Sequence, residues 1–396
     1  MTDADLRRAT LEVLAREGVD AATIPRIAVV AGVAPASVYR RYDSGLDAVF
    51  DVWQHDLRPC AQQAMRAALA LGQQPSSPDA AWLTAELKAP GVLTRALVSV
   101  LAVARRLGPV GTDVIADVEA DLDSLVLEHT ELPGVMVVAH VLPPFGAWLL
   151  DPVSHGVASA VAALLNRFST EYSDPQHWQE SSTGNRFVAP APFSTTTDDA
   201  ALDDLRNATF RVVARYGFDG ATATRIAREA GRSLTSAYRR VGSKDELVAD
   251  AIGAALSADL GFSGAENASS LSFARPDRLR RAWQASMNQI DDRNRTNRAF
   301  VLELLGAAGT SPLVETAAKQ WGNAVQQRFR LAAQTLTADR ADTLSKFWAY
   351  RMATGIGGLL FSFAAPRVIQ RYDPAPVICA NDAVTAALVE NPTRAG

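Results

Sequence analysis

The sequence has little cysteine and no long apolar run. Cys60 and Cys379 are the only cysteines among 396 residues, and neither belongs to a CxxC pair or a Cys/His cluster. A disulfide framework and a structural zinc site are therefore not expected. No stretch reaches the roughly 18–20 uninterrupted apolar residues of a membrane span, and the acidic start lacks the apolar core of a signal peptide. These absences predict a cytoplasmic protein without a membrane partner.

Signatures of catalysis are missing as well. The sequence contains no G-x-S-x-G, no Walker A motif, no HExxH and no G-x-G-x-x-G that opens a helix after a strand. Its five histidines, at positions 55, 129, 140, 155 and 177, share no ligand spacing. We therefore expect neither an enzyme nor a cofactor nor a metal site.

The length predicts several domains, because a single hydrophobic core usually stops growing well before 396 residues. Hydrophobic residues make up 48% and charged residues 21% of the chain, an ordinary balance for a globular protein. The net charge of −4 gives no sign of a nucleic-acid partner. Any such sign has to come from local patches of charge.

A long internal repeat organises the chain. Residues 6–44 align without a gap with residues 205–243, at an offset of 199, and roughly half of the positions are identical. The similarity continues weakly downstream, where Trp82 corresponds to Trp283. A period this long indicates a duplicated whole protein, and the Ser-, Thr- and Pro-rich stretch 171–199 between the copies is predicted to be a linker.

Each copy begins with the pattern of a helix-turn-helix. Leu6, Ala9, Val13 and Leu14 form one helical stripe, and the second copy repeats it. Gly18 and its counterpart Gly217 stand where a left-handed residue would end this first helix.

The next two helices of the motif are short. Thr23 and Thr222 suit the N-cap of a second helix that stops at Gly32 or Gly231. A third helix starts three residues later, with Pro35 as its start signal in the first copy. Two short helices joined by such a turn describe a helix-turn-helix whose second helix enters the major groove.

The third helix carries side chains suited to phosphates and base edges. A generic amphipathic helix with a solvated arginine pair is the alternative, but the matched spacing in two copies favours DNA. The predicted DNA contacts are Thr23, Pro35, Ala36, Ser37, Tyr39, Arg40 and Arg41 in the first copy, and Thr222, Ser233, Leu234, Thr235, Ser236, Tyr238, Arg239, Arg240 and Lys244 in the second.

Local charge separates the two copies. Residues 205–244 hold nine Arg or Lys against two acids, a net of +7, whereas residues 6–45 hold six against four, a net of +2. Because phosphate neutralisation dominates affinity for DNA, the second copy is predicted to be the stronger binder.

These segments resemble the TetR family of bacterial transcriptional regulators over about 45 residues per copy. The family pattern is Thr-x-x-x-Ile-Ala-x-x-Ala-Gly-Val-Ser followed by Tyr-x-x-Phe-x-Ser-Lys-x-x-Leu. From Thr23 the chain reads TIPRIAVVAGVA and from Tyr39 YRRYDSG; the second copy reads TATRIAREAGRS and YRRVGSKDEL. The first copy departs from the pattern at Gly45, where the family has a phosphate-contacting lysine that the second copy keeps as Lys244.

The resemblance implies all-helical bodies that bind a small effector and pair through their last two helices. Candidate pairing helices are 134–168 and about 340–390, where Gly355, Gly357 and Gly358 suit either close helix approach or ordinary core packing. An aromatic and polar set suits a small-molecule cavity, but each member is more often core or surface. These residues are His140, Trp148, Trp348, Tyr350 and Arg351. The residues that bind the effector therefore stay unknown.

Together these observations predict an all-α protein of two tandem units, each a three-helix DNA-binding head followed by a helical effector and dimerisation-type body. The predicted ranges are 1–48 (first head), 49–170 (first body), 171–199 (linker), 200–247 (second head) and 248–392 (second body). The predicted function is a ligand-responsive repressor that binds an imperfect palindrome of double-stranded DNA as a single-chain pseudo-dimer, with further self-association left open. The alternative is a small-molecule sensor or protein-interaction module in which one or both heads no longer bind DNA.

Overall fold

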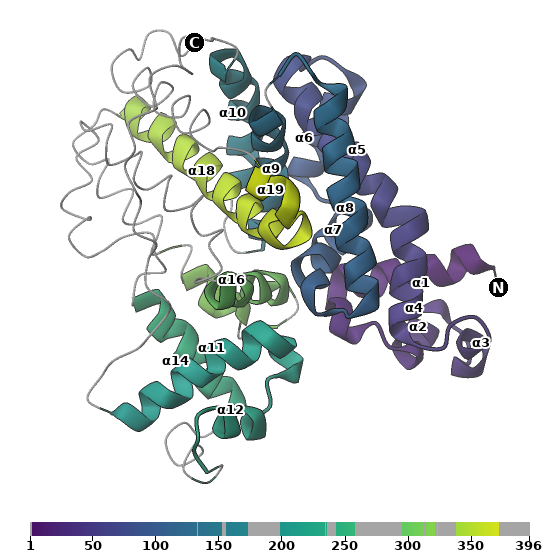
Figure 1. Cartoon of the computed structure of the whole chain (residues 1–396), viewed down its shortest axis with the longest axis vertical. Helices are drawn as coiled ribbons and strands as arrows, with labels where there is room; N and C mark the ends of the chain where they lie inside the picture. Colours follow the sequence, from purple (N-terminus) through teal and green to yellow (C-terminus); the bar gives the residue numbers. More distant parts are fainter. Residues whose placement is uncertain are drawn as a thin grey trace. The chain divides into compact units, whose positions relative to one another are not determined.

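The computed structural model describes residues 2–132, 134–152, 156–172, 199–233, 235, 243–257, 295–309, 311–312, 314–320, 323 and 338–371. These residues form helices and turns and contain no strand, which confirms the all-α prediction (Figure 1). The chain divides into two compact units. Unit 1 draws on Met1–Asp151, His155–Thr183 and Asp342–Gly396, and unit 2 on Pro152–Ser154 and Gly184–Ala341.

The first head consists of α1 (Asp3–Glu17), a 3-10 turn η1 (Val19–Ala21), α2 (Ile24–Ala31), α3 (Pro35–Tyr39) and α4 (Gly45–Val52). A capping box between Thr2 and Asp5 starts α1. The predicted apolar stripe of this helix is buried, and α1 packs on both α2 and α4. The head is therefore a three-helix core closed by α4.

The glycine that ends the first helix of each head has the predicted positive φ but not the ψ of a left-handed residue. Gly18 has φ 83° and ψ 176°, and its counterpart Gly217 has φ 73° and ψ 177°. The positive φ was expected, but ψ is extended, so neither residue adopts the left-handed helical conformation. This region of backbone conformation is open almost only to glycine, which gives the repeated glycine its physical reason.

The first body follows without a break. A π-helical turn η2 (Trp53–Leu57) joins α4 to α5 (Arg58–Gln73). The remaining helices are α6 (Pro78–Lys88), α7 (Val92–Val103), the short η3 (Ala104–Arg106), α8 (Pro109–Glu128), α9 (Gly134–Leu150) and α10 (Val157–Tyr172). Helix α9 runs through Pro143 and Pro144, and its side chains from Val135 to Leu150 are all buried. It is the central helix of unit 1.

The described residues contain no single helix that is long and apolar enough to cross a membrane. By length and composition alone, a bent pair of segments, Pro78–Lys88 and Val92–Arg106, passes the same test with an angle of 76° between its halves.

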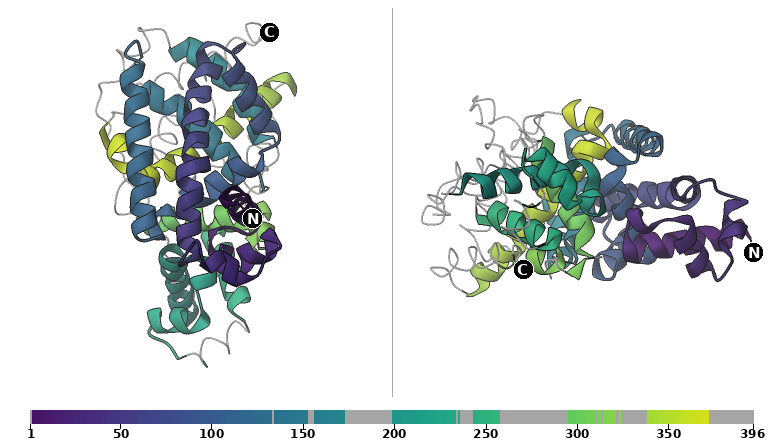
Figure 2. Two further views of the ribbon diagram at one scale, coloured as in Figure 1. Left: turned by 90° about the vertical axis from the view of Figure 1, so that its right-hand side faces the viewer. Right: turned by 90° about the horizontal axis from the view of Figure 1, so that it is seen from below.

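Unit 1 also contains helices from the far end of the chain, α18 (Ala338–Ala364) and α19 (Pro366–Arg371). The backbones of α18 and α9 are in direct contact at two glycines. A Cβ built on Gly146 would stand 1.8 Å from the carbonyl oxygen of Ala353, and one built on Gly357 would stand 1.9 Å from the carbonyl oxygen of Leu142. The rings of Phe145 and Phe361 meet edge to face with centroids 5.0 Å apart. The turned views show this yellow-green helix against the blue helices of the first body (Figure 2).

Helix α19 contacts α8 through hydrogen bonds and ion pairs. Arg371 donates to Asp123 at 2.7 Å, and the backbone N–H of Arg367 donates to Glu119 at 2.7 Å. Helix α19 thus packs on α8, although the two helices are about 250 residues apart in sequence.

Unit 2 contains the second head and part of its body: α11 (Ala200–Gly220), α12 (Ala223–Glu229), α14 (Lys244–Ser257) and α16 (Arg295–Ala308). Its packing repeats that of unit 1, because α11 contacts α12, α14 and α16 much as α1 contacts α2, α4 and α7. Phe210 and Phe300 meet edge to face between α11 and α16, with centroids 5.0 Å apart. The repeat seen in the sequence is therefore present in the packing, although most of the predicted linker lies outside the described residues.

Candidate nucleic-acid interface

Local signals set the turn of the first helix-turn-helix. The hydroxyl of Thr23 accepts a hydrogen bond from the backbone of Arg26 at 3.4 Å, which caps α2 as predicted. Gly32 ends α2 in the left-handed conformation, with φ 67° and ψ 34°. Ala34 then occupies the N-cap of α3 without a side-chain hydrogen bond, and Pro35 is its first residue. The start of α3 thus depends on the fixed φ of proline in place of a capping hydroxyl.

The outer face of α3 carries most of the predicted contacts of this head. Val38 is completely buried and anchors the helix, while Pro35 and Ala36 are exposed and Tyr39 is 53% exposed. Arg40 is also exposed and donates to the hydroxyl of the half-buried Ser37 at 3.3 Å. The structure therefore brings these side chains together on one accessible helix.

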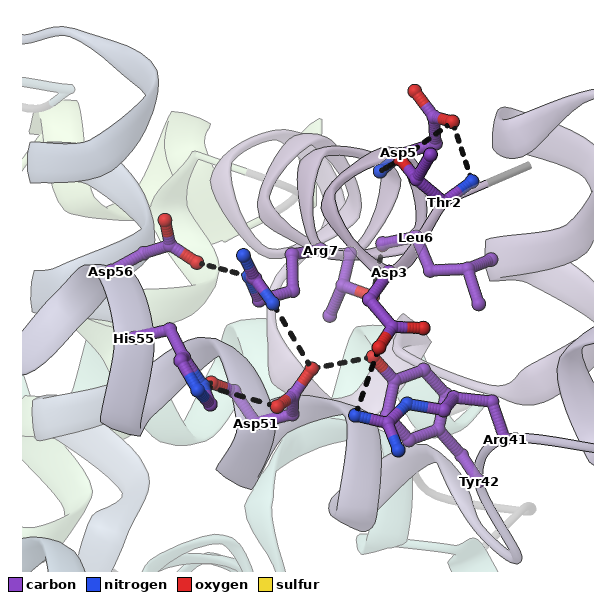
Figure 3. A network of polar contacts seen from close by, with 11 residues as sticks. Thr2, Asp3, Asp5, Leu6, Arg7, Arg41, Tyr42, Asp51, His55 and Asp56 are labelled. Carbon is purple, nitrogen blue, oxygen red and sulfur yellow. Dashed lines mark hydrogen bonds and ion pairs between the residues drawn. The ribbon is translucent and has the colours of Figure 1, made fainter.

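Arg41 and Tyr42 follow α3, and each contacts an acidic side chain of the same head (Figure 3). The guanidinium of Arg41 lies 3.2 Å from the carboxylate of Asp3 in an exposed ion pair. Tyr42 is buried and donates to Asp51 at 2.7 Å; burial and this acidic neighbour raise the pKa of the Tyr42 phenol. Tyr42 thus fixes α3 to α4, and Arg41 already has an anionic partner on α1.

Gly45 stands at the position of the family's lysine, at the start of α4. A Cβ built there would lie 1.8 Å from the carbonyl oxygen of Ala22 and 3.2 Å from the Cα of Thr23. The beginning of α4 therefore touches the backbone that precedes α2. A side chain of any size at position 45 requires one of these segments to move.

Most arginines of the first head form ion pairs with carboxylates. Arg7, Arg8, Arg16, Arg26 and Arg41 each have a carboxylate within 4.0 Å. Arg40 is the exception among the described residues of this head. The predicted net charge of +2 is therefore largely neutralised at short range.

The second head repeats the cap and the turn. Thr222 accepts from the backbone of Arg225 at 3.3 Å, and Gly231 has φ 65°. Ser233 and Thr235 are exposed, as a groove-facing start of the third helix requires. The other predicted contacts of this head lie outside the described residues: Leu234, Ser236, Tyr238, Arg239 and Arg240. Lys244 begins α14, but its side chain is not described.

Among the arginines of the second head that the structure describes, fewer have a carboxylate partner. Arg206, Arg211 and Arg232 have carboxylate partners at 2.7, 2.7 and 2.5 Å. Arg215 and Arg225 instead lie over the ring of Tyr216, with guanidinium carbons 5.2 and 4.8 Å from its centroid. Such contacts leave the positive charge in place, so this head keeps more charge for an anionic partner.

Of the five body residues considered for an effector site, the structure describes the side chains of His140, Trp148 and Tyr350. His140 is buried in α9 with Nδ1 2.7 Å from the carbonyl oxygen of Met136, and burial lowers its pKa. Trp148 is buried and donates to the carbonyl of Glu86 at 3.2 Å. Tyr350 is buried in α18, while the side chains of Trp348 and Arg351 are outside the described part. In that part, no group of three or more His, Cys, Asp or Glu side chains is arranged to hold a metal ion.

The sequence comparisons identify the two heads. The family described as bacterial regulatory proteins, tetR family, matches residues 6–44 and again residues 205–251. No curated protein matches the chain in sequence. The matched segments coincide with the two helix-turn-helix segments predicted from the repeat.

Proposed function

The chain carries two TetR-like units in tandem, and we propose that it is a sequence-specific DNA-binding regulator of transcription that acts in the cytoplasm as a single-chain pseudo-dimer. The observation that carries the proposal is the family match to both copies of the repeat, together with the exposure of Pro35, Ala36, Tyr39 and Arg40 along and just after α3 of the first head. A ligand-responsive repressor that binds an imperfect palindrome is the specific form of this proposal. The effector and the residues that hold it stay unassigned.

The packing of α9 against α18 supports the pseudo-dimer. The two helices come from the C-terminal parts of the two repeats, where the pairing helices were predicted. They meet closely at Gly146 and Gly357, and α19 adds ion pairs to α8. Under this proposal, the contact that two chains make in a homodimer is made within one chain.

Neutralisation of the first head favours a second candidate, in which that head has lost DNA binding. Five of its arginines are ion-paired, and Gly45 replaces the lysine. Under this alternative the chain is a sensor or interaction module, or it binds DNA through the second head alone.

Selection of DNA fragments from the source genome tests the proposal. Fragments retained by the full chain should share two related half-sites, and their affinity should fall steeply as salt rises because phosphate contacts release counterions. Unenriched fragments, or affinity that does not depend on salt, would instead support the sensor or interaction module. Enrichment of a single half-site would assign DNA binding to one head.

A further inference from the structure

The two heads differ in the partner of one arginine near the start of the helix-turn-helix. At the offset of 199, Glu17 corresponds to Tyr216 and Arg26 corresponds to Arg225. In the first head, Arg26 donates to both carboxylate oxygens of Glu17: Nε donates to Oε1 at 2.9 Å and to Oε2 at 2.7 Å, and Nη2 donates to Oε1 at 2.5 Å. These hydrogen bonds lower the pKa of Glu17, so the pair stays ionised and the charge of Arg26 is matched by a carboxylate.

The second head places an aromatic ring where the first has that carboxylate. Tyr216 is 40% exposed, and the guanidinium groups of Arg215 and Arg225 both lie over its ring. Within the described part of the chain, no acidic side chain pairs with either arginine. The ring holds both cations in place through its π face and cancels neither charge.

A third position has changed together with this pair. A Cβ built on Gly220 would lie 2.9 Å from Cβ of Tyr216 and 3.5 Å from Nη1 of Arg225, and this Nη1 donates to the carbonyl of Gly220 at 2.6 Å. The first head has Ala21 at the corresponding position. Glycine at 220 thus makes room for the arginine to lie against both the ring and the backbone.

We propose that Arg225, oriented by Tyr216 and assisted by Arg215, binds a backbone phosphate of double-stranded DNA. The first head lacks this contact because the equivalent Arg26 is ion-paired with Glu17. The proposal rests on the proposed DNA-binding function. Arg225 lies on α12, the first helix of the helix-turn-helix, which crosses the DNA backbone in this motif. Arg228 is exposed one turn further along the same helix and extends the positive face.

The test measures the salt dependence of binding by the full chain to a labelled duplex of about thirty base pairs and mixed sequence. Such a probe suffices because phosphate contacts do not depend on sequence. Tyr216→Glu and Arg225→Ala should each flatten the slope of log affinity against log salt by about one unit, with a roughly fivefold to tenfold loss near 0.1 M salt. Glu17→Tyr should steepen the slope by about one unit, because it releases Arg26.

Matched variants separate this effect from net charge and from folding. Leu127→Glu and Glu128→Tyr change the net charge by the same amounts at exposed positions of α8, and Tyr216→Phe keeps the ring. All three should keep the wild-type slope. The proposal is overturned if the wild-type chain binds the duplex and Tyr216→Glu and Arg225→Ala show the same salt slope and affinity as Leu127→Glu. If the wild-type chain binds neither this duplex nor genomic fragments, the proposed function fails together with it.

Discussion

Gly45 begins α4 where the backbone of that helix touches the residues before α2. Because a Cβ there would stand 1.8 Å from a backbone oxygen, the position excludes the lysine that the second head carries as Lys244. The loss of this lysine is therefore linked to the way the first head packs and does not stand as an isolated surface change.

Substitution of Gly45 should consequently lower stability without a gain in DNA affinity. Gly45→Ala and Gly45→Lys each force two backbone segments apart, a type of overpacking that costs about 1–3 kcal/mol. Thermal unfolding followed by circular dichroism should show a lower midpoint for both variants. Gly253→Ala is the matched control, because its Cβ meets open space in the middle of a helix, and it should be neutral or stabilising by up to about 1 kcal/mol. A Gly45→Lys chain that melts like the wild type and binds DNA more tightly would contradict this explanation.

Single residues show how far the sequence allows prediction. Thr23, Gly32 and Pro35 act within one turn of their own positions, so their roles as cap, turn and helix start follow from local rules. The ψ of Gly18 and the contact of Gly45 depend on which segments pack together. Local rules therefore predicted where the motif lies but not these conformations.

The elements show a similar division. The helices of both heads, and the packing of α1 and α11 on equivalent neighbours, follow from the repeat and its apolar stripes. The close contact of α18 with α9 joins segments about two hundred residues apart, and the predicted glycines did not specify which surface they would meet. Pro143 and Pro144 also lie within a continuous helix, although proline usually ends one.

Close approach of α9 and α18 predicts that Gly146 and Gly357 act as a unit. Gly146→Ala and Gly357→Ala should each lower the thermal midpoint, because a methyl group at either site overlaps the backbone of the opposing helix. The double variant should lose clearly less stability than the sum of the single losses, because the first substitution already separates the helices. Additive losses would show that the two glycines do not share one contact.

At the scale of the whole molecule, the duplication gives one chain two unequal heads. The predicted recognition helices begin with Pro35 and Ala36 in one head and with Leu234 and Thr235 in the other. Residues near the start of this helix read base edges, so the half-sites should differ. A fused pair presents one of each head in every complex, whereas a homodimer presents two identical ones.

Permutation of the selected operator tests this asymmetry. The natural site should bind more tightly than a site with two left halves or one with two right halves, and mismatches should cost more in the half-site under the second, more basic head. Affinities from fluorescence anisotropy at a fixed salt concentration give the comparison. If either symmetric site matches the natural one, the two heads read the same sequence.

The number of chains on one operator tests the central claim most directly. Light scattering coupled to size exclusion should give the free chain a mass near 42.3 kDa in dilute solution. Mixed with the selected operator duplex, the protein should form a complex of one chain and one duplex, because both heads and both pairing surfaces belong to the same polypeptide. A complex that contains two chains per operator, together with a free protein of twice the chain mass, would contradict the single-chain pseudo-dimer.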